Sequence, residues 1–382
     1  GSAIPAEIYW LLSSDQLQIL QKIVPQVPQT GSTELRETGY YTMRNGWEIN
    51  DCYMTVTAGL SEYKPDHQHG DMLGVVAYAN GHEILPNYQV AYKYPDFPFW
   101  KNSFAKNVAI VDSIPQGRDW NANSGGSGFG KWNILPVPTV HQWIMNDQFD
   151  YFCGSHNGFT DLDVEYYREI LFVKEGFWII RDHFNSESTH RYQQIWQGQF
   201  EKGKDSASVR RNFDDGSGIE IIQLKNLNTT PQFGTHRDKG NVLFASEPKT
   251  EQTFTTLIYT FRSETGHPGR KSQTIGLRKN WQIKRSEGGK CDLSPEINSN
   301  AEWTISREAS GGFLINVSRL IYQDKEILLK PATTLFINKT DRELTIMLLE
   351  KQSVQIISGT AHISGQIQGG KVLIPGTTYL IR

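Results

Sequence analysis

The sequence has few cysteines, almost no net charge and no long hydrophobic run. Its three cysteines, Cys52, Cys153 and Cys291, are widely spaced, which predicts neither a disulfide framework nor a CxxC metal site. The formal net charge of -3 argues against general nucleic-acid affinity, because such affinity needs a basic surface. No apolar stretch approaches the roughly 20 residues of a membrane-spanning helix. We therefore expect neither a nucleic-acid partner nor a membrane span.

Aromatic residues, by contrast, are abundant. The chain has 10 Trp, 16 Tyr and 18 Phe among its 382 residues. Aromatic rings pack well on strands and also provide flat platforms for sugar rings. Composition alone does not choose between these two uses.

A helical spacing of apolar residues is found near the N-terminus, in residues 6–24. Ser14 or Asp15 is a candidate cap for a second helix there, and Pro25 ends the pattern. The first ten residues lack the basic start and the long apolar middle of a signal peptide. Residues 1–28 are therefore predicted to form a helical segment, and the localisation is not readable from this end.

From about residue 35 onward, the sequence consists of short β-branched and aromatic runs separated by turn residues. Many strands without long intervening helices predict an antiparallel β-sandwich. Lys174–Gly176, written KEG, reads as a hairpin turn, and RNG at 44–46 reads as another. Smaller strands follow the polar stretch near residue 290. We expect a large β-sandwich domain over 29–290 and a small β domain over 291–382.

The segment HQHGD places His67, His69 and Asp71 at alternate positions, directly before an apolar run. In a strand, residues two apart point to the same face. If this segment is extended, two imidazoles and a carboxylate share one face of a sheet. Two idle surface histidines are the plainer interpretation, and the motif alone does not decide between the two.

Two other segments invite a functional interpretation. The loop NANSGGSGFGKWN, residues 121–133, has P-loop spacing, but Trp132 stands where a magnesium-binding hydroxyl is needed, so a flexible surface loop is predicted. His156 lies in a polar, glycine-bounded stretch before a strong strand, where sites are often built. The remaining lone histidines are interpreted as ordinary surface or core groups.

Several of these segments together resemble the C-terminal half of the heparinase II/III-like polysaccharide lyases. The resemblance rests on HQHGDMLGVVAYANG, ILPNYQVAY, SFAKNVAIVDSIPQ and YYREILFVKEGFWIIRDHF followed by HRYQQIWQ, which occur in the family's order. It runs from about residue 40 to 200 and more weakly to the end. In that family an (α/α) toroid precedes a large β-sandwich and a small β domain. The resemblance thus implies a toroid upstream in the same parent protein, with residues 6–24 as its last helix.

The family's reaction is β-elimination at a uronic-acid residue of an acidic polysaccharide. Such an enzyme must neutralise the carboxylate, remove the C5 proton and protonate the leaving oxygen. The resemblance implies that His67 faces the substrate, as a base or as a charge-stabilising group. The family's principal tyrosine lies on the toroid, so Tyr92 and Tyr94 are the candidate catalytic tyrosines within this chain.

The family usually has a structural zinc. Its ligands map onto His69, Asn87 and Lys106 of this sequence. A carboxamide and a cation do not replace a carboxylate and an imidazole around a dication. We therefore expect no zinc cofactor, and we expect the Lys106 ammonium to occupy the metal's place and to hydrogen-bond Asn87 and His69.

An acidic substrate needs a local basic cleft, and Lys93, Lys101, Arg118 and Lys131 are expected to line it, together with His156. The resemblance favours a heparan-type glycosaminoglycan over alginate, and a periplasmic or secreted protein of a bacterium. A non-catalytic carbohydrate-binding β module is the alternative, supported by the loss of the zinc ligands. An assembly protein with aromatic-rich sheets is a third possibility.

Overall fold

The computed structural model describes residues 6–381 of the chain, with internal gaps. The residues left undescribed are 1–5, 25, 62–64, 89, 91–93, 125–128, 205–206, 226, 228–229, 263–268, 272–273, 287–290, 295, 308–310, 323–324, 340–343, 351, 359–370, 374–377 and 382. Residues 1–31 form one unit and residues 32–382 form another. Among the described residues, no helix is long and apolar enough to cross a membrane.

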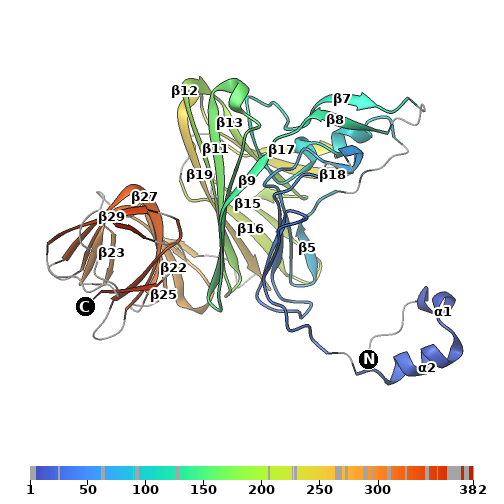
Figure 1. Ribbon diagram of the computed structural model, residues 1–382, viewed down its shortest axis with the longest axis horizontal. Helices are drawn as coiled ribbons and strands as arrows, with labels where there is room; N and C mark the ends of the chain where they lie inside the picture. The colour runs from blue at the N-terminus through green and yellow to red at the C-terminus, as the bar shows by residue number, and fades with distance from the viewer. Residues whose placement is uncertain are drawn as a thin grey trace. The chain divides into compact units, whose positions relative to one another are not determined.

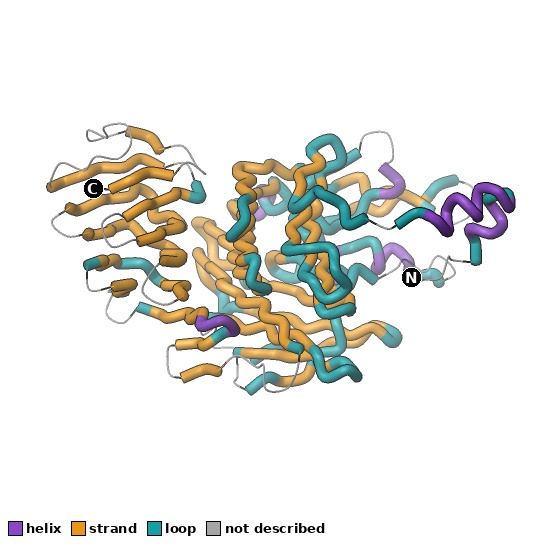
Figure 2. Tube along the Cα trace, turned by 90° about the horizontal axis from the view of Figure 1, so that it is seen from below, coloured by secondary structure: helices purple, strands orange, loops and turns teal. Residues whose placement is uncertain are grey.

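The N-terminal unit contains two short helices, α1 (Ile8–Leu11) and α2 (Ser14–Lys22) (Figure 2). Ser13 caps α2, because its hydroxyl accepts from the backbone of Gln16 while the Gln16 side chain accepts from the backbone of Ser13. This reciprocal capping box satisfies two backbone donors at once. The helical segment is confirmed, but the predicted cap, Ser14 or Asp15, is wrong by one or two residues.

The central layer of the second unit is an eight-stranded antiparallel sheet with the order β14-β15-β16-β19-β12-β11-β10-β9 (Figure 1). Its strands are β9 (Pro138–Met145), β10 (Phe149–His156), β11 (Val164–Val173), β12 (Phe177–His190), β14 (Glu201–Lys202), β15 (Ser208–Asn212), β16 (Gly218–Gln223) and β19 (Lys249–Phe261). The turn at Lys174–Gly176 joins β11 to β12, as the sequence predicted.

Two smaller sheets pack on one face of this layer. The five-stranded sheet contains β1 (Thr33–Leu35), β2 (Tyr40–Arg44), β3 (Tyr53–Thr57), β4 (Val75–Ala79) and β5 (His82–Leu85), and the four-stranded sheet contains β6 (Ala109–Val111), β13 (Tyr192–Gln197), β17 (Gln232–His236) and β18 (Lys239–Ala245). One apolar core includes buried residues from both small sheets and from the central sheet. This packing is the β-sandwich that the sequence predicted.

The central sheet buries apolar residues on both faces. In β11, Ile170 contributes to the core beneath the two small sheets, whereas Leu171 contributes to a second core on the opposite face. In β12, Ile180 likewise contributes to the core beneath the two small sheets, and Ile179 contributes to the second core. Successive strand residues point to opposite faces, so continuous apolar runs such as REILFV indicate a sheet that is covered on both sides.

The C-terminal strands form a twelve-stranded antiparallel sheet that provides the other half of the second core. Its strands are β20 (Gly269–Lys271), β21 (Thr274–Gly276), β22 (Trp281–Arg285), β23 (Cys291–Ser294), β24 (Ile297–Ser299), β25 (Trp303–Arg307), β26 (Gly311–Tyr322), β27 (Lys325–Lys339), β28 (Leu344–Leu348), β29 (Gln352–Ser358), β30 (Lys371–Leu373) and β31 (Thr378–Ile381). Phe149 of the central sheet packs edge to face on Phe313, with ring centroids 5.2 Å apart. The predicted division at residue 290 remains a prediction.

Short helical turns and one β-ribbon complete the described fold. They are η1 (Pro65–His67), α3 (Phe97–Trp100), η2 (Ser103–Ala105), η3 (Thr160–Leu162), η5 (Arg278–Asn280), β7 (Arg118–Ala122) and β8 (Gly130–Ile134). The predicted surface loop at 121–133 is therefore partly wrong, because both of its ends belong to the β7–β8 ribbon. Trp120 and Trp132 pack against each other across this ribbon, with ring centroids 4.8 Å apart.

A buried ion pair connects the central sheet to the loops above it. Arg168 of β11 and Asp182 of β12 are fully buried, and the guanidinium donates to both carboxylate oxygens, at 2.6 and 2.9 Å. The same guanidinium donates to the carbonyl oxygens of Leu73 and Asn107, at 2.8 and 3.1 Å. Burial alone would raise the pKa of the Asp182 carboxyl. The charge and hydrogen bonds of Arg168 outweigh this effect, so the pKa is lowered and the pair remains charged.

We predict that Arg168→Met destabilises the protein by about 3–5 kcal/mol, because it leaves a buried carboxylate and two carbonyls without their donor. Chemical denaturation monitored by tryptophan fluorescence measures the loss. Arg36→Met is the matched control, since the Arg36 side chain is 74% exposed and pairs with Glu34 at the surface; its denaturation midpoint should stay close to that of the unsubstituted protein, because exposed ion pairs contribute little to stability. Equal losses in the two variants would contradict this role of Arg168.

Candidate active site

The HQHGD segment is not a strand, and the predicted alternation of its side chains on a sheet face is wrong. Pro65–His67 form the turn η1, and β4 begins only at Val75. The intervening backbone bonds several different partners: Gly70 donates to the Lys101 carbonyl at 2.8 Å and Leu73 donates to the Thr57 carbonyl at 2.7 Å. Because these acceptors lie on separate segments, residues 68–74 follow a loop path rather than a sheet ladder.

Side chains from a second segment hold this loop in place. Gln116 brackets Met72, because its amide accepts from the Met72 N–H at 2.7 Å and donates to the Met72 carbonyl at 3.1 Å. The Ser103 hydroxyl donates to the Gly70 carbonyl at 2.9 Å. A Cβ at Gly70 would lie 2.3 Å from the Asn102 side-chain oxygen and 2.7 Å from the Gly117 nitrogen. Glycine is therefore required at this position by close backbone approach.

The four side chains of HQHGD, His67, Gln68, His69 and Asp71, nevertheless line one cavity of about 670 Å³ between the loop and the five-stranded sheet. Its lining residues come from β2, β3, β4 and the loops beside them: Glu37, Thr38, Tyr40, Thr55, Thr57, Gly59, Leu60, Ser61, His67, Gln68, His69, Asp71, Met72, Val76 and Asn87. This volume lies within the range of about 300–1,000 Å³ that is typical of small-ligand sites. We call it the histidine cavity.

His67 lies at the solvent side of the histidine cavity. Its side chain is 69% exposed, and its Nε2 is 3.9 Å from an Asp66 carboxylate oxygen. An ion pair at this distance and exposure contributes little to stability. The imidazole is thus available to a molecule that enters the cavity.

His69 is the less exposed member of the pair and is partly buried. Burial lowers its pKa to about 3, with further lowering by the charges of Lys106, Lys101 and His67. The imidazole is therefore neutral at pH 7 and offers one hydrogen-bond donor and one acceptor. A neutral ring packed beside a lysine suits a structural or orienting role better than proton transfer.

Asp71 and Lys106 lie deeper. Burial raises the pKa of the Asp71 carboxyl, and the Lys106 charge opposes this rise. Burial lowers the pKa of Lys106 to about 8, so the ammonium is still mostly protonated at pH 7. Lys106 donates a hydrogen bond to the side-chain oxygen of Asn87.

The residues that the resemblance maps onto zinc ligands, His69, Asn87 and Lys106, do not suit a zinc ion. The Asn87 oxygen already accepts from an ammonium, and an ammonium has no lone pair for a metal. Among the described residues there is no group of three or more His, Cys, Asp or Glu side chains that can hold a metal. Only His69 retains the donor type expected of a zinc ligand.

Of the expected basic residues, the three that the structure describes, Lys101, Arg118 and Lys131, do not line the histidine cavity. Lys101 is 2% exposed, and its ammonium donates to the Asp66 carbonyl beneath η1. Arg118 pairs with Asp161, and Lys131 is exposed on β8, a strand that contacts η1. Lys93 lies outside the described residues. A role of these four residues in substrate binding therefore remains a prediction.

The other predicted site residues lie elsewhere or are not described. Tyr92 lies outside the described residues. Tyr94 is half-buried, and the Arg237 guanidinium lies 3.9 Å from the centre of its ring. His156 is 5% exposed and contributes to a different cavity, on the central sheet. Its Nε2 is 3.4 Å from Gln116, the residue that brackets Met72.

Tyr40 is a cavity residue that the sequence reasoning missed. It lies on β2, is 44% exposed and lines the histidine cavity with His67. Burial and the nearby Asp71 raise the pKa of its phenol, so the hydroxyl is protonated at pH 7 and can donate a proton. Its only sequence signal is the alternation in YYTMR, where Tyr40 and Thr42 share the face opposite to the buried Tyr41 and Met43.

Comparisons with known proteins show the family of this chain and its fold. A family model described as heparinase II/III-like, C-terminal, matches residues 27–292. The heparin-sulfate lyase of Pedobacter heparinus is 20% identical over 304 residues, which are 73% of this chain and 41% of that protein.

Solved structures show the same fold. The heparan sulfate lyase HepC of Pedobacter heparinus superposes with a TM-score of 0.54 at 16% identity, covering 79% of this chain and 46% of that chain. A heparinase III superposes with a TM-score of 0.51 at 14% identity, covering 74% and 42%. The chain thus spans less than half the length of these relatives.

We predict that the purified protein contains no stoichiometric zinc, whereas the double substitution Asn87→Asp with Lys106→His confers zinc binding. The double variant places a carboxylate and an imidazole beside His69, which restores a suitable donor set. Elemental analysis after dialysis measures zinc per chain. The control pair Asn87→Ala with Lys106→Met should bind none. One zinc per chain in the unsubstituted protein would refute the replacement of the metal by Lys106.

Proposed function

Because the chain belongs to the heparinase II/III-like family, whose C-terminal region it matches, we propose that it forms the β-sandwich half of a polysaccharide lyase active site. The proposed substrate is a uronic-acid-containing polysaccharide, with heparan-type glycosaminoglycan favoured over alginate. The Pedobacter heparinus relative, named as a heparin-sulfate lyase, supports this substrate class. Because that relative is bacterial, it also supports a periplasmic or secreted parent protein.

The proposed reaction is a β-elimination. A base removes the C5 proton of the uronate, the C5–H electrons form the C4–C5 double bond, and the C4–O4 bond breaks. An acid then protonates the departing O4. The carboxylate on C5 must be neutralised, because it carries the negative charge that develops in the transition state.

The observation that carries the proposal is the exposed His67 imidazole at the mouth of the histidine cavity. Histidine suits both a base and a charge-stabilising group near neutral pH. We assign His67 one of these two roles at C5. We assign His69, which is partly buried and neutral, a structural role beside His67.

The proposed active site needs a second half. We infer that the remaining catalytic groups lie on an upstream α/α toroid of the same parent protein. Within the described chain, Tyr40 is the tyrosine that lines the histidine cavity, and it is a candidate proton donor. Of the tyrosines expected from the sequence, Tyr94 does not line this cavity, and the role of Tyr92, which lies outside the described residues, stays a prediction.

We predict that His67→Ala lowers the lyase rate of the parent protein by about 10²–10⁴ fold, the range for loss of a general acid or base. Ultraviolet absorbance of the unsaturated uronate product measures the rate. His82→Ala is the matched control, since His82 lies on β5, stacks on Phe213 and does not line the cavity; it should retain nearly full activity.

The isolated chain should bind the substrate weakly and turn over almost none of it, because the second half of the site is missing. Full activity of the chain alone would contradict the need for a toroid. An unchanged rate in His67→Ala would remove His67 from the mechanism.

Lys131 is our candidate for attracting the acidic substrate. It is exposed on β8, which contacts the turn that carries His67. We predict that Lys131→Ala weakens binding of a heparin-derived oligosaccharide about three- to tenfold at low salt, and less at high salt because surface charges are then screened. Calorimetry at two salt concentrations measures this. Lys202→Ala, at an exposed site on β14, is the control, and an equal loss there would contradict a specific role for Lys131.

A non-catalytic carbohydrate-binding module is the second candidate function. It is favoured by the hydrogen bond from Lys106 to Asn87, two residues that the resemblance maps onto zinc ligands, because an ammonium and a carboxamide are poor ligands for zinc. A parent protein that binds the polysaccharide with a salt-dependent affinity but yields no unsaturated product would support this alternative.

A further inference from the structure

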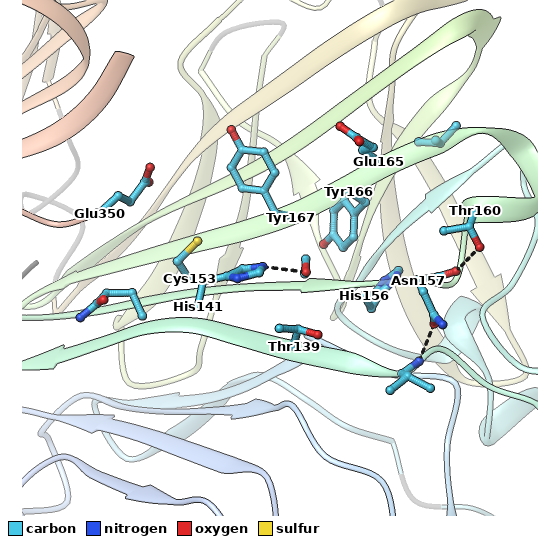
Figure 3. Close-up of a pocket in the computed structure, with 14 residues that line it drawn as sticks. Thr139, His141, Cys153, His156, Asn157, Thr160, Glu165, Tyr166, Tyr167 and Glu350 are labelled. Atoms are coloured by element: carbon cyan, nitrogen blue, oxygen red, sulfur yellow. Dashed lines mark hydrogen bonds between the residues drawn. The ribbon is translucent and has the colours of Figure 1, made fainter. Parts of the chain in front are cut away.

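A second cavity of about 790 Å³ lies on the central sheet, on strands β9, β10 and β11 (Figure 3). No residue that lines it also lines the histidine cavity. Ser155 pairs with Thr139 on one side and with Tyr167 on the other. These side chains therefore share one face of the sheet, the same face that carries the second apolar core at Tyr151 and Cys153. We call this site the sheet cavity.

The C-terminal sheet closes one end of the sheet cavity. Glu350 follows β28 and lines the cavity. Its carboxyl accepts a hydrogen bond from the Tyr151 hydroxyl at 2.7 Å. Burial and the neighbouring Glu169 raise the pKa of Glu350 to about 9, so this end wall is a neutral carboxylic acid at pH 7. Glu169 itself is ionised and pairs with Arg181 at 2.7 Å.

The rest of the lining is polar but almost uncharged. Burial lowers the pKa of His156 to about 3 and also lowers the pKa of His141, so both rings are neutral at pH 7. Among the described residues that line the cavity there is no lysine or arginine, and Glu165 is the one carboxyl besides Glu350. An anionic ligand would find no counter-charge here.

An aromatic ring provides a flat wall. Tyr167 is 39% exposed, and its ring stacks on His183 with centroids 4.2 Å apart and planes 14° apart. His183 is in turn within hydrogen-bond distance of the Thr253 hydroxyl, at 3.1 Å. In Figure 3 the Tyr167 ring stands on the same side of the sheet as His141 and Cys153. A supported, partly exposed ring of this kind is a suitable platform for a sugar.

Hydroxyl and amide groups surround this platform. His141 is 2.7 Å from the Ser155 hydroxyl, and Thr139, Thr160, Gln142 and Asn157 also line the cavity. Cavities that bind small molecules combine an apolar wall with a few placed polar groups. The lining of the sheet cavity therefore suits a neutral molecule that has many hydroxyl groups.

We propose that the sheet cavity binds a neutral saccharide, made of hexose or N-acetylhexosamine residues without carboxylate or sulfate. The site is separate from the histidine cavity and does not depend on the lyase reaction. It gives the chain a second carbohydrate specificity, for a glycan different from the acidic polysaccharide proposed above.

Calorimetric titration of the full chain with triacetylchitotriose, maltotriose and cellotriose tests this proposal. We expect at least one of them to bind with an affinity that is unchanged by salt and by an excess of heparin-derived oligosaccharide. Tyr167→Ala should weaken that binding about three- to tenfold through loss of the stacking platform, while Tyr167→Phe should retain most of it. His67→Ala should leave it unchanged, which separates this site from the proposed lyase site.

Tyr78→Ala is the matched control, because Tyr78 is 43% exposed on β4 and does not line the sheet cavity. It should bind the neutral probe within about twofold of the unsubstituted protein, a difference of less than 0.5 kcal/mol. Thermal unfolding of each variant verifies that the fold is intact. Three outcomes would overturn the proposal: no neutral probe binds at millimolar concentration, Tyr167→Ala binds as well as Tyr78→Ala, or the cationic chitosan trimer binds in preference to all three neutral probes.

Discussion

The buried Arg168 guanidinium is the contact on which the arrangement of the site depends. It pairs with Asp182 on the neighbouring strand and donates to the carbonyls of Leu73 and Asn107. These two carbonyls belong to the loop before β4 and to the segment before β6. A buried charge is tolerated only when it is paired and hydrogen-bonded. Both segments must therefore approach the central sheet at this point, and His67 and His69 lie just before one of them.

The same requirement explains the environment of Lys106. This residue lies directly before Asn107, whose amide donates to the Val75 and Pro86 carbonyls. Its backbone position is thus set by the hydrogen bonds of its neighbour. Lys106 is only 2% exposed. Its ammonium donates a hydrogen bond to Asn87, and the Asp71 carboxyl partly offsets the lowering of its pKa by burial. The buried Lys106 charge in turn helps to keep the nearby His69 imidazole neutral, after the larger effect of burial.

The two cavities differ in chemistry because the central sheet separates two different environments. The histidine cavity is bordered by loops, where an exposed imidazole and a phenol can meet a charged substrate. The sheet cavity is bordered by regular strands and by the C-terminal sheet, whose Glu350 is kept neutral by burial beside Glu169. Strand pairing gives the sheet cavity a fixed row of hydroxyl groups. The proposed lyase site and the proposed saccharide site therefore share no lining residue.

The sequence alone determined the local features of this protein, because periodicity and turn chemistry depend on neighbouring residues. The apolar run of β11, the turn at Lys174–Gly176 and the helical segment near the N-terminus were all predictable in this way. The path of the HQHGD loop was not, since its partners Gln116 and Arg168 are 44 and 95 residues away. The place of Tyr40 in the site was not predictable either, because only the packing of β2 beside that loop brings its side chain to the histidine cavity. The spacing of apolar and turn residues along the chain determined the helices, strands and turns. Long-range hydrogen bonds to buried backbone groups determined which side chains come together in the tertiary structure.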